Sequence, residues 1–103
     1  MEKYDKLYTK DECLNYLISK AKEELNDVIS YNSLYESLKS HGKYDDAEEI
    51  EHIANQEYEH AETIFELLSE REYNIHNDSE IMSLLKKVKE IFDTEWCYVN
   101  NRC

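Results

Sequence analysis

Three residues of this sequence, Glu24, Glu57 and His60, have the types and spacing of metal ligands. Glu57 and His60 are three residues apart in Glu57-Tyr58-Glu59-His60, so on a helix their side chains project to one side about one turn apart. In helical bundles, a Glu-x-x-His unit of this kind supplies a carboxylate and an imidazole to carboxylate-bridged dimetal sites. We therefore interpret these residues as metal ligands, with Glu24 as a second carboxylate.

The apolar pattern around both glutamates predicts that they are buried. One stripe of a helix would contain Leu17, Glu24, Tyr31 and Leu38. A stripe on a second helix would contain Ala47, Ile50, Ala54, Glu57, Ala61, Ile64 and Leu68, with His60 beside it. Polar residues are rare on these stripes, so Glu24 and Glu57 are expected to lie among apolar side chains.

Buried carboxylates need a compensating charge. An isolated carboxylate in a bundle core costs several kcal/mol, unless it is paired, protonated or bound to a cation. Lys20 and Lys22 only flank the first stripe, and residues 44–70 contain no Lys or Arg. A bound metal ion is therefore the simplest way to neutralise Glu24 and Glu57.

Capping signals define the two helices that would carry these ligands. The segment Thr9-Lys10-Asp11-Glu12 is a capping box, and apolar residues then recur every three or four positions. The first helix is predicted to continue to about Ser40, because Gly42 can take the left-handed conformation that closes a helix. The second helix is predicted from Asp45, where acidic residues suit the helix dipole, to about Arg71. Together they form an antiparallel helical hairpin.

A third amphipathic helix is predicted after a connector over residues 72–76. The sequence Asn77-Asp78-Ser79-Glu80 has the composition of a helix cap. The buried side of the third helix is expected to carry Ile81, Leu85, Val88, Phe92 and Trp96. The tail, residues 98–103, has no periodicity that predicts a regular element. The expected fold class is therefore all-α, a long helical hairpin plus a third helix.

The composition agrees with a single all-α domain over residues 1–103. The chain has one Gly and no Pro, whereas a β-sandwich or barrel needs turn residues every ~8–12 positions. Its 24 acidic and 12 basic residues give a net charge of −12, which disfavours nucleic acids and anionic membranes as partners. No apolar run approaches the roughly 20 residues of a membrane span, and the amino terminus lacks the hydrophobic stretch of a signal peptide. We therefore expect a cytoplasmic protein.

The apolar stripes of one chain supply only half of a dimetal site. The complete bundle site takes two Glu-x-x-His units and two further glutamates, and the stripes contain one of each. The third helix carries Glu80, Glu90 and Glu95 but no His, so it is not the missing half. A two-fold dimer of hairpins would place both halves around two metal ions in a four-helix bundle. We predict a homodimer or a higher even oligomer.

The ligand pattern resembles a known family. Glu24, Tyr31 seven residues later, and Glu57 and His60 in NQEYEHAETIFELL are similar to the diiron half-site of the rubrerythrin branch of the ferritin-like superfamily. The resemblance covers about residues 20–69, half of the chain. It implies that Glu24 is a terminal ligand, that Glu57 bridges the metals, that His60 ligates through its imidazole and that Tyr31 hydrogen-bonds a ligand carboxylate. It also implies two iron ions per dimer, and the same ligand types suit manganese or zinc.

The chain departs from the rubrerythrin pattern in three ways. Full-length rubrerythrins hold two hairpins and add a rubredoxin domain with two CxxC pairs, and neither is present here, so a separate electron donor is expected. Asp27 stands where the family usually has Ala, and the extra carboxylate of the second family hairpin has no counterpart. The resemblance therefore implies a symmetric dinuclear iron site with rubrerythrin-like oxidoreductase activity, by peroxide or oxygen reduction or as a ferroxidase.

Two other functions stay open at the level of sequence. The same site could oxidise Fe(II) for iron storage or delivery. Alternatively, the chain could be a non-catalytic acidic helical interaction protein whose buried glutamates are protonated or bonded across a dimer. The cysteines, Cys13, Cys97 and Cys103, form no CxxC pair, which argues against a disulfide framework or a thiolate zinc site and leaves the role of Cys97 and Cys103 open.

Overall fold

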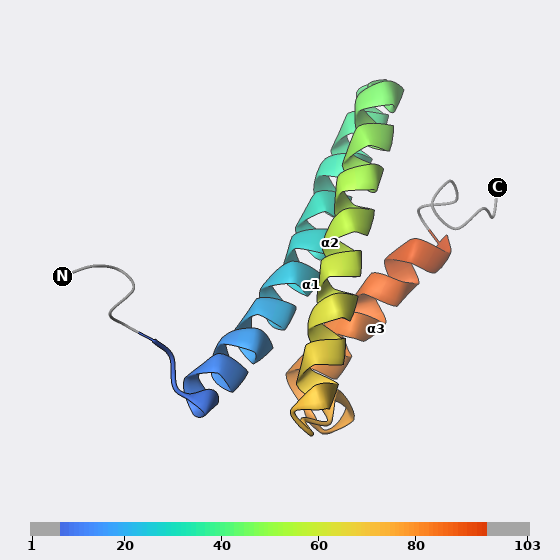
Figure 1. The fold of residues 1–103 in the computed structure, drawn as a ribbon. Helices are drawn as coiled ribbons and strands as arrows, with labels where there is room; N and C mark the ends of the chain where they lie inside the picture. Colours follow the sequence, from blue (N-terminus) through green and yellow to red (C-terminus); the bar gives the residue numbers. More distant parts are fainter. Residues whose placement is uncertain (1–6, 95–103) are drawn as a thin grey trace.

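The computed structural model describes residues 7–94 and consists of three α-helices and a short 3-10 turn. The elements in chain order are α1 (Lys10–Ser40), α2 (Tyr44–Glu70), η2 (Ile75–Asn77) and α3 (Ser79–Thr94). Helices α1 and α2 form a long antiparallel hairpin, and α3 lies across it at the end away from the α1–α2 loop (Figure 1). The predicted all-α class, with a hairpin and a third helix, is confirmed.

The ends of α1 form as their residue types predict. The Thr9 hydroxyl accepts a hydrogen bond from the Glu12 amide at 3.1 Å, and the Glu12 carboxylate accepts one from the Thr9 amide at 2.8 Å, so the capping box is complete. At the other end, Gly42 has a φ of +76°. This left-handed residue lets the Lys43 amide donate to the Leu38 carbonyl at 2.8 Å, which closes the helix.

The connection between α2 and α3 is compact. Helix α2 ends at Glu70, one residue before the predicted end, and Glu72 takes a positive φ of 63°. Asp78 then caps α3, because its Oδ1 accepts hydrogen bonds from the amides of Glu80 and Ile81, each at 3.1 Å. The predicted cap within residues 77–80 is therefore present, with Asp78 as the capping residue.

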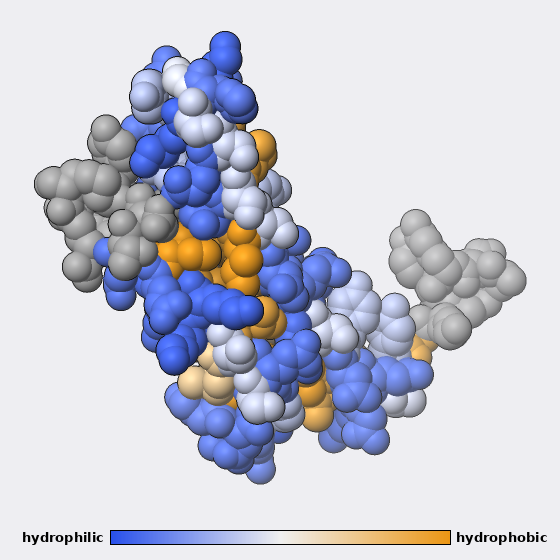
Figure 2. All heavy atoms as spheres, turned by 180° about the vertical axis from the view of Figure 1, so that it is seen from behind, coloured by the Kyte–Doolittle hydropathy of each residue, from blue (hydrophilic) through white to orange (hydrophobic). Residues whose placement is uncertain are grey.

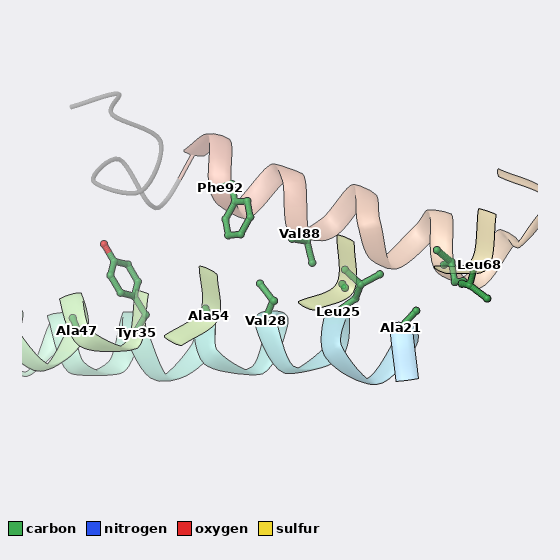
Figure 3. Close-up of a cluster of buried hydrophobic side chains, with 11 residues drawn as sticks. Ala21, Leu25, Val28, Tyr35, Ala47, Ala54, Leu68, Val88 and Phe92 are labelled. Carbon is green, nitrogen blue, oxygen red and sulfur yellow. The ribbon is translucent and has the colours of Figure 1, made fainter. Parts of the chain in front are cut away.

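The core lies where α3 packs on the hairpin. Figure 3 shows Leu25 and Val28 of α1 directed toward α3, and Val88 and Phe92 of α3 directed back toward the hairpin. The Phe92 ring also meets the edge of Tyr58 in α2, with 5.0 Å between ring centres. The buried apolar residues are Ala21, Leu25, Val28, Tyr35, Ala47, Ala54, Ala61, Leu68, Ile81, Val88 and Phe92. Of the predicted buried side of α3, Leu85 is half-buried and Trp96 lies outside the described residues.

The side of the hairpin opposite α3 carries exposed apolar groups, and we call it the open face. Leu34 follows Leu25 by nine residues, about two and a half helical turns, so it lies on the opposite side of α1 from the residues that contact α3. Leu34 is 44% exposed, and Ile53 of α2 is 39% exposed. Apart from such groups, the surface is largely hydrophilic; the view from behind in Figure 2 shows an apolar strip between hydrophilic side chains.

None of the helices within residues 7–94 is both long enough and apolar enough to cross a lipid bilayer. This agrees with the hydropathy of the sequence, whose charged residues are spread along each helix.

Candidate metal centre

The hairpin brings the three predicted ligands together. Ligand atoms of Glu24 on α1 and of Glu57 and His60 on α2 all lie within 4.8 Å of one another. They meet because α1 and α2 are antiparallel, so that position 24 of α1 is level with positions 57–60 of α2. Glu57 and His60 share one side of α2 through their three-residue spacing, as the sequence indicated.

The imidazole of His60 faces both carboxylates. Its Nδ1 lies 3.2 Å from Oε1 of Glu57 and 3.4 Å from Oε1 of Glu24. Lys20 contributes a weaker contact from outside the group, with its Nζ 3.9 Å from Oε2 of Glu24. The three side chains therefore converge on one small volume rather than pairing separately with distant partners.

The three side chains of the group differ in burial, which decreases from Glu24 on α1 to His60 on α2. The Glu24 side chain is 9% exposed, that of Glu57 is 21% exposed and that of His60 is 66% exposed. The group thus has a buried carboxylate at its base and an imidazole at its rim. Because His60 lies on the side of α2 away from α3, the rim belongs to the open face of the hairpin.

One oxygen of this group lacks a hydrogen-bond donor. Oε1 of Glu24 is buried, and no donor within residues 7–94 reaches it with hydrogen-bond geometry. A buried carboxylate oxygen without a donor carries a desolvation penalty that a cation would remove. Two carboxylates and an imidazole are also a donor set that suits iron, manganese or zinc. These residues therefore fit the metal that the sequence pattern implies.

The surroundings of Glu24 disfavour its ionised form. Burial raises the pKa of Glu24 above its ordinary value, and the neighbouring carboxylate of Glu57 raises it further. His60 and Lys20 act in the opposite direction but do not reverse the shift. A cation bound at this group would compete with a proton for the Glu24 carboxylate.

Tyr31 and Asp27 lie near the group without joining it. The Tyr31 side chain is half-buried and packs against the core, and its hydroxyl makes no hydrogen bond within residues 7–94. Its predicted bond to a ligand carboxylate thus stays a prediction for the assembled site. Asp27 is half-buried one turn after Glu24, and burial, followed by the charges of Glu24 and Glu23, raises its pKa.

The sequence interpretation missed Glu51. This side chain of α2 is 1% exposed, and both carboxylate oxygens are buried without a hydrogen-bond donor. It lies four residues after Ala47 and three before Ala54, so it borders the stripe of small residues that was recognised. The spacing alone did not distinguish it from the many solvated glutamates of α2, because its burial depends on how the elements pack.

Comparisons of this chain with protein-family models, with curated proteins and with solved structures gave no match. The interpretation of the centre therefore rests on its own geometry. What the arrangement can do chemically follows from its donors: a buried carboxylate, a partly buried carboxylate and an accessible imidazole can hold a transition-metal ion at the open face.

Proposed function

We propose that this protein binds iron through Glu24, Glu57 and His60, in a dinuclear carboxylate site formed across a dimer, and acts as a rubrerythrin-like oxidoreductase. Its reaction would be peroxide or oxygen reduction, or ferroxidase turnover. The observation that carries the proposal is the convergence of three ligand atoms from two helices within 4.8 Å at an open face, where Oε1 of Glu24 is buried and accepts no hydrogen bond from residues 7–94.

The dimer is proposed because one chain offers too few ligands. Three protein side chains complete neither of two metal coordination shells, whereas a second hairpin related by a two-fold axis would double the set. The accessible rim at His60 and the exposed apolar residues Leu34 and Ile53 lie on the same open face. Pairing two open faces would bury these apolar groups while it brings the two half-sites together.

Each ligand would have a separate task in this site. Glu24 would hold the metal from the buried side, Glu57 would lie between the two half-sites, and His60 would ligate through an imidazole nitrogen. When bound, a pair of Fe(II) ions supplies two electrons, which with two protons reduce one hydrogen peroxide molecule to two water molecules. Regeneration would require an external electron donor, and zinc, which has no redox chemistry, would occupy the same ligands without that function.

Iron stoichiometry on a matched pair of variants tests the proposal. After anaerobic Fe(II) loading, the wild-type protein should hold about one iron ion per chain on a dimer or its multiple, with native mass read from light scattering in the same run. Glu57→Ala should lose nearly all of this iron. Glu59→Ala removes an exposed carboxylate two residues away and should retain it.

Retention of full iron stoichiometry by Glu57→Ala would show that the ligand assignment is wrong. If the ligands are correct, rapid mixing of the Fe(II)-loaded protein with hydrogen peroxide should oxidise both ions of a dimer together. This oxidation is compared in Glu57→Ala, which should lose it, and in the control Glu59→Ala, which should keep it. Iron that is oxidised once and then released, without repeated reduction of peroxide or oxygen, would support storage or delivery in place of catalysis.

A further inference from the structure

A second buried carboxylate, Glu51, has no role in the metal centre. It is 1% exposed, and neither Oε1 nor Oε2 accepts a hydrogen bond from a residue within 7–94. Among the described residues, Glu24 and Glu51 are the charged side chains in the buried class, and Glu24 at least faces an imidazole. Glu51 therefore has the larger unmet need for a positive partner.

Glu51 lies away from the group of Glu24, Glu57 and His60. It precedes Glu57 by six residues, which corresponds to about 9 Å along the helix axis. It precedes His60 by nine residues, about two and a half turns, so the two side chains leave opposite sides of α2. His60 belongs to the open face, and Glu51 belongs to the side that faces α3.

Another buried oxygen without a hydrogen-bond partner among the described residues, Oδ1 of Asn32, lies at the same level of the hairpin. Contact between Glu24 and His60 sets the register, and Asn32 follows Glu24 by eight residues while Glu51 precedes His60 by nine. The axial positions of Asn32 and Glu51 therefore agree to within about one residue rise. Oδ1 of Asn32 is buried and has no hydrogen-bond partner.

Both residues also share the α3 side of the hairpin. Asn32 follows Leu25 by seven residues and Val28 by four, and Figure 3 shows both of these side chains directed toward α3. Glu51 precedes Tyr58 by seven residues, and Tyr58 contacts Phe92 of α3. Two helices thus place three oxygen atoms that lack donors on one side and at one level of the molecule.

Nearby charge agrees with this placement. Burial raises the pKa of Tyr35, and the negative charge of Glu51 raises it further, while Lys39 acts in the opposite direction. Burial also raises the pKa of Glu51, which the charges of His52 and Lys39 counteract in part. A proton on Glu51 would satisfy one of its oxygens at most, whereas a cation bound between the two helices could be shared by the carboxylate and the amide oxygen.

We propose that Glu51 and Asn32 form a second cation site, separate from the Glu24, Glu57 and His60 centre, for a hard divalent ion such as Mg²⁺ or Mn²⁺. The donors are a carboxylate and an amide oxygen, with no nitrogen or sulfur ligand, which is the chemistry that these ions prefer. The overall charge of −12 raises the local concentration of cations around the chain. The site would join α1 to α2 on the side that α3 covers.

Manganese binding to the full chain tests this site when the first centre has been removed. Glu57→Ala and His60→Ala together form the background, and bound Mn²⁺ is counted by equilibrium dialysis in about 0.15 M KCl, which screens diffuse surface binding. The background should bind about one Mn²⁺ per chain with a rise in Tm. Adding Glu51→Gln should weaken that binding at least tenfold, and adding Glu48→Gln, an exposed control, should not.

Asn32→Ala, made in the same background, provides an independent variant should Glu51→Gln fail to fold, and it should also weaken Mn²⁺ binding. Equal Mn²⁺ affinity in the background, Glu51→Gln and Asn32→Ala would overturn the proposal. So would a background that binds no Mn²⁺, because Glu51 would then be a neutral buried acid. These outcomes do not depend on iron binding at the first centre.

Discussion

Two buried glutamates, Glu24 and Glu51, differ in what surrounds them. Glu24 lies beside a second carboxylate and an imidazole, with Nδ1 of His60 3.4 Å from its Oε1. Glu51 has no hydrogen-bond donor at either oxygen. Burial raises the pKa of both, because the charged form loses its water. The ionised form of each side chain is therefore destabilised, and a bound cation or a proton would remove most of that destabilisation.

The burial of the Glu51 carboxylate predicts how the stability of the chelator-treated protein varies with pH. A carboxyl whose folded pKa is raised contributes stability below its ordinary value of 4.5, and this contribution is lost as the pH rises through the folded pKa. Glu51→Gln cannot ionise, so it should be more stable than wild type at pH 7 by roughly 1–3 kcal/mol, and the difference should vanish below the ordinary pKa.

Urea unfolding of both proteins across this pH range, in the presence of a chelator, measures the difference. The exposed Glu48→Gln serves as the control for a change in net charge and should differ from wild type by a few tenths of a kcal/mol at most. A pH-independent difference for Glu51→Gln would show that the pKa of Glu51 is the same in the folded and unfolded states.

At the scale of elements, Asp78 joins α3 to the rest of the molecule. Its Oδ1 caps α3, and its Oδ2 accepts a hydrogen bond from the Tyr73 hydroxyl at 2.6 Å. Lys22 of α1 places its Nζ 3.7 Å from Oδ2 of Asp78 and 3.0 Å from Oε1 of Glu80. One carboxylate thus connects the start of α3, the preceding connector and α1.

Asp78→Ala should therefore destabilise the fold by about 1–3 kcal/mol, as expected for the loss of a cap and a buried hydrogen bond. Asp78→Asn should cost less, because its amide oxygen can still cap α3. Thermal unfolding followed by circular dichroism compares the two variants. Equal losses would contradict the capping role, since only Ala lacks the acceptor.

The pH dependence of this junction has the opposite sign from that of Glu51. Burial alone would raise the pKa of Asp78, but the hydrogen bonds from Tyr73 and from the amides of Ile81 and Glu80, together with the charge of Lys22, hold it below its ordinary value. The stability from Asp78 is therefore present above the ordinary pKa and is lost as the pH falls through the folded pKa. The difference in the free energy of unfolding between Asp78→Ala and wild type should therefore become smaller in acid.

At the scale of the whole molecule, the hairpin has two unlike sides. One side is covered by α3, and the other, the open face, presents Leu34, Ile53 and the rim of the metal centre. Exposed apolar groups next to an incomplete ligand set favour a second copy as the partner of this face. The proposed dimer and the proposed metal site therefore depend on the same surface, the open face.

Ile53→Lys should separate the proposed dimer. A lysine buried between two open faces would lack a partner and would cost several kcal/mol, so the native mass should fall to that of one chain at micromolar concentration. The amount of iron bound per chain after anaerobic loading should fall together with the native mass. Tyr44→Lys, at an exposed aromatic residue at the start of α2, should leave both unchanged. A dimer that persists in Ile53→Lys would place the interface elsewhere.

Local signals in the sequence determined the helices. The capping box of Thr9, the left-handed Gly42 and the cap at Asp78 depend on neighbouring residues only, so the ends of the helices could be predicted within about one residue. Helical spacing likewise selected Glu24, Glu57 and His60, because ligands three residues apart on one helix and an anomalous carboxylate on the other can be found without knowing the packing.

Only the tertiary structure decided which faces are covered. The packing of the chain leaves Glu51 only 1% exposed, although its spacing alone left it among the solvated glutamates of α2. The same packing left His60 accessible on the open face. Burial depends on contacts between residues far apart in the chain, whereas caps and periodicity depend on near neighbours. The helices could therefore be predicted from the sequence, but the buried oxygens without hydrogen-bond donors could not.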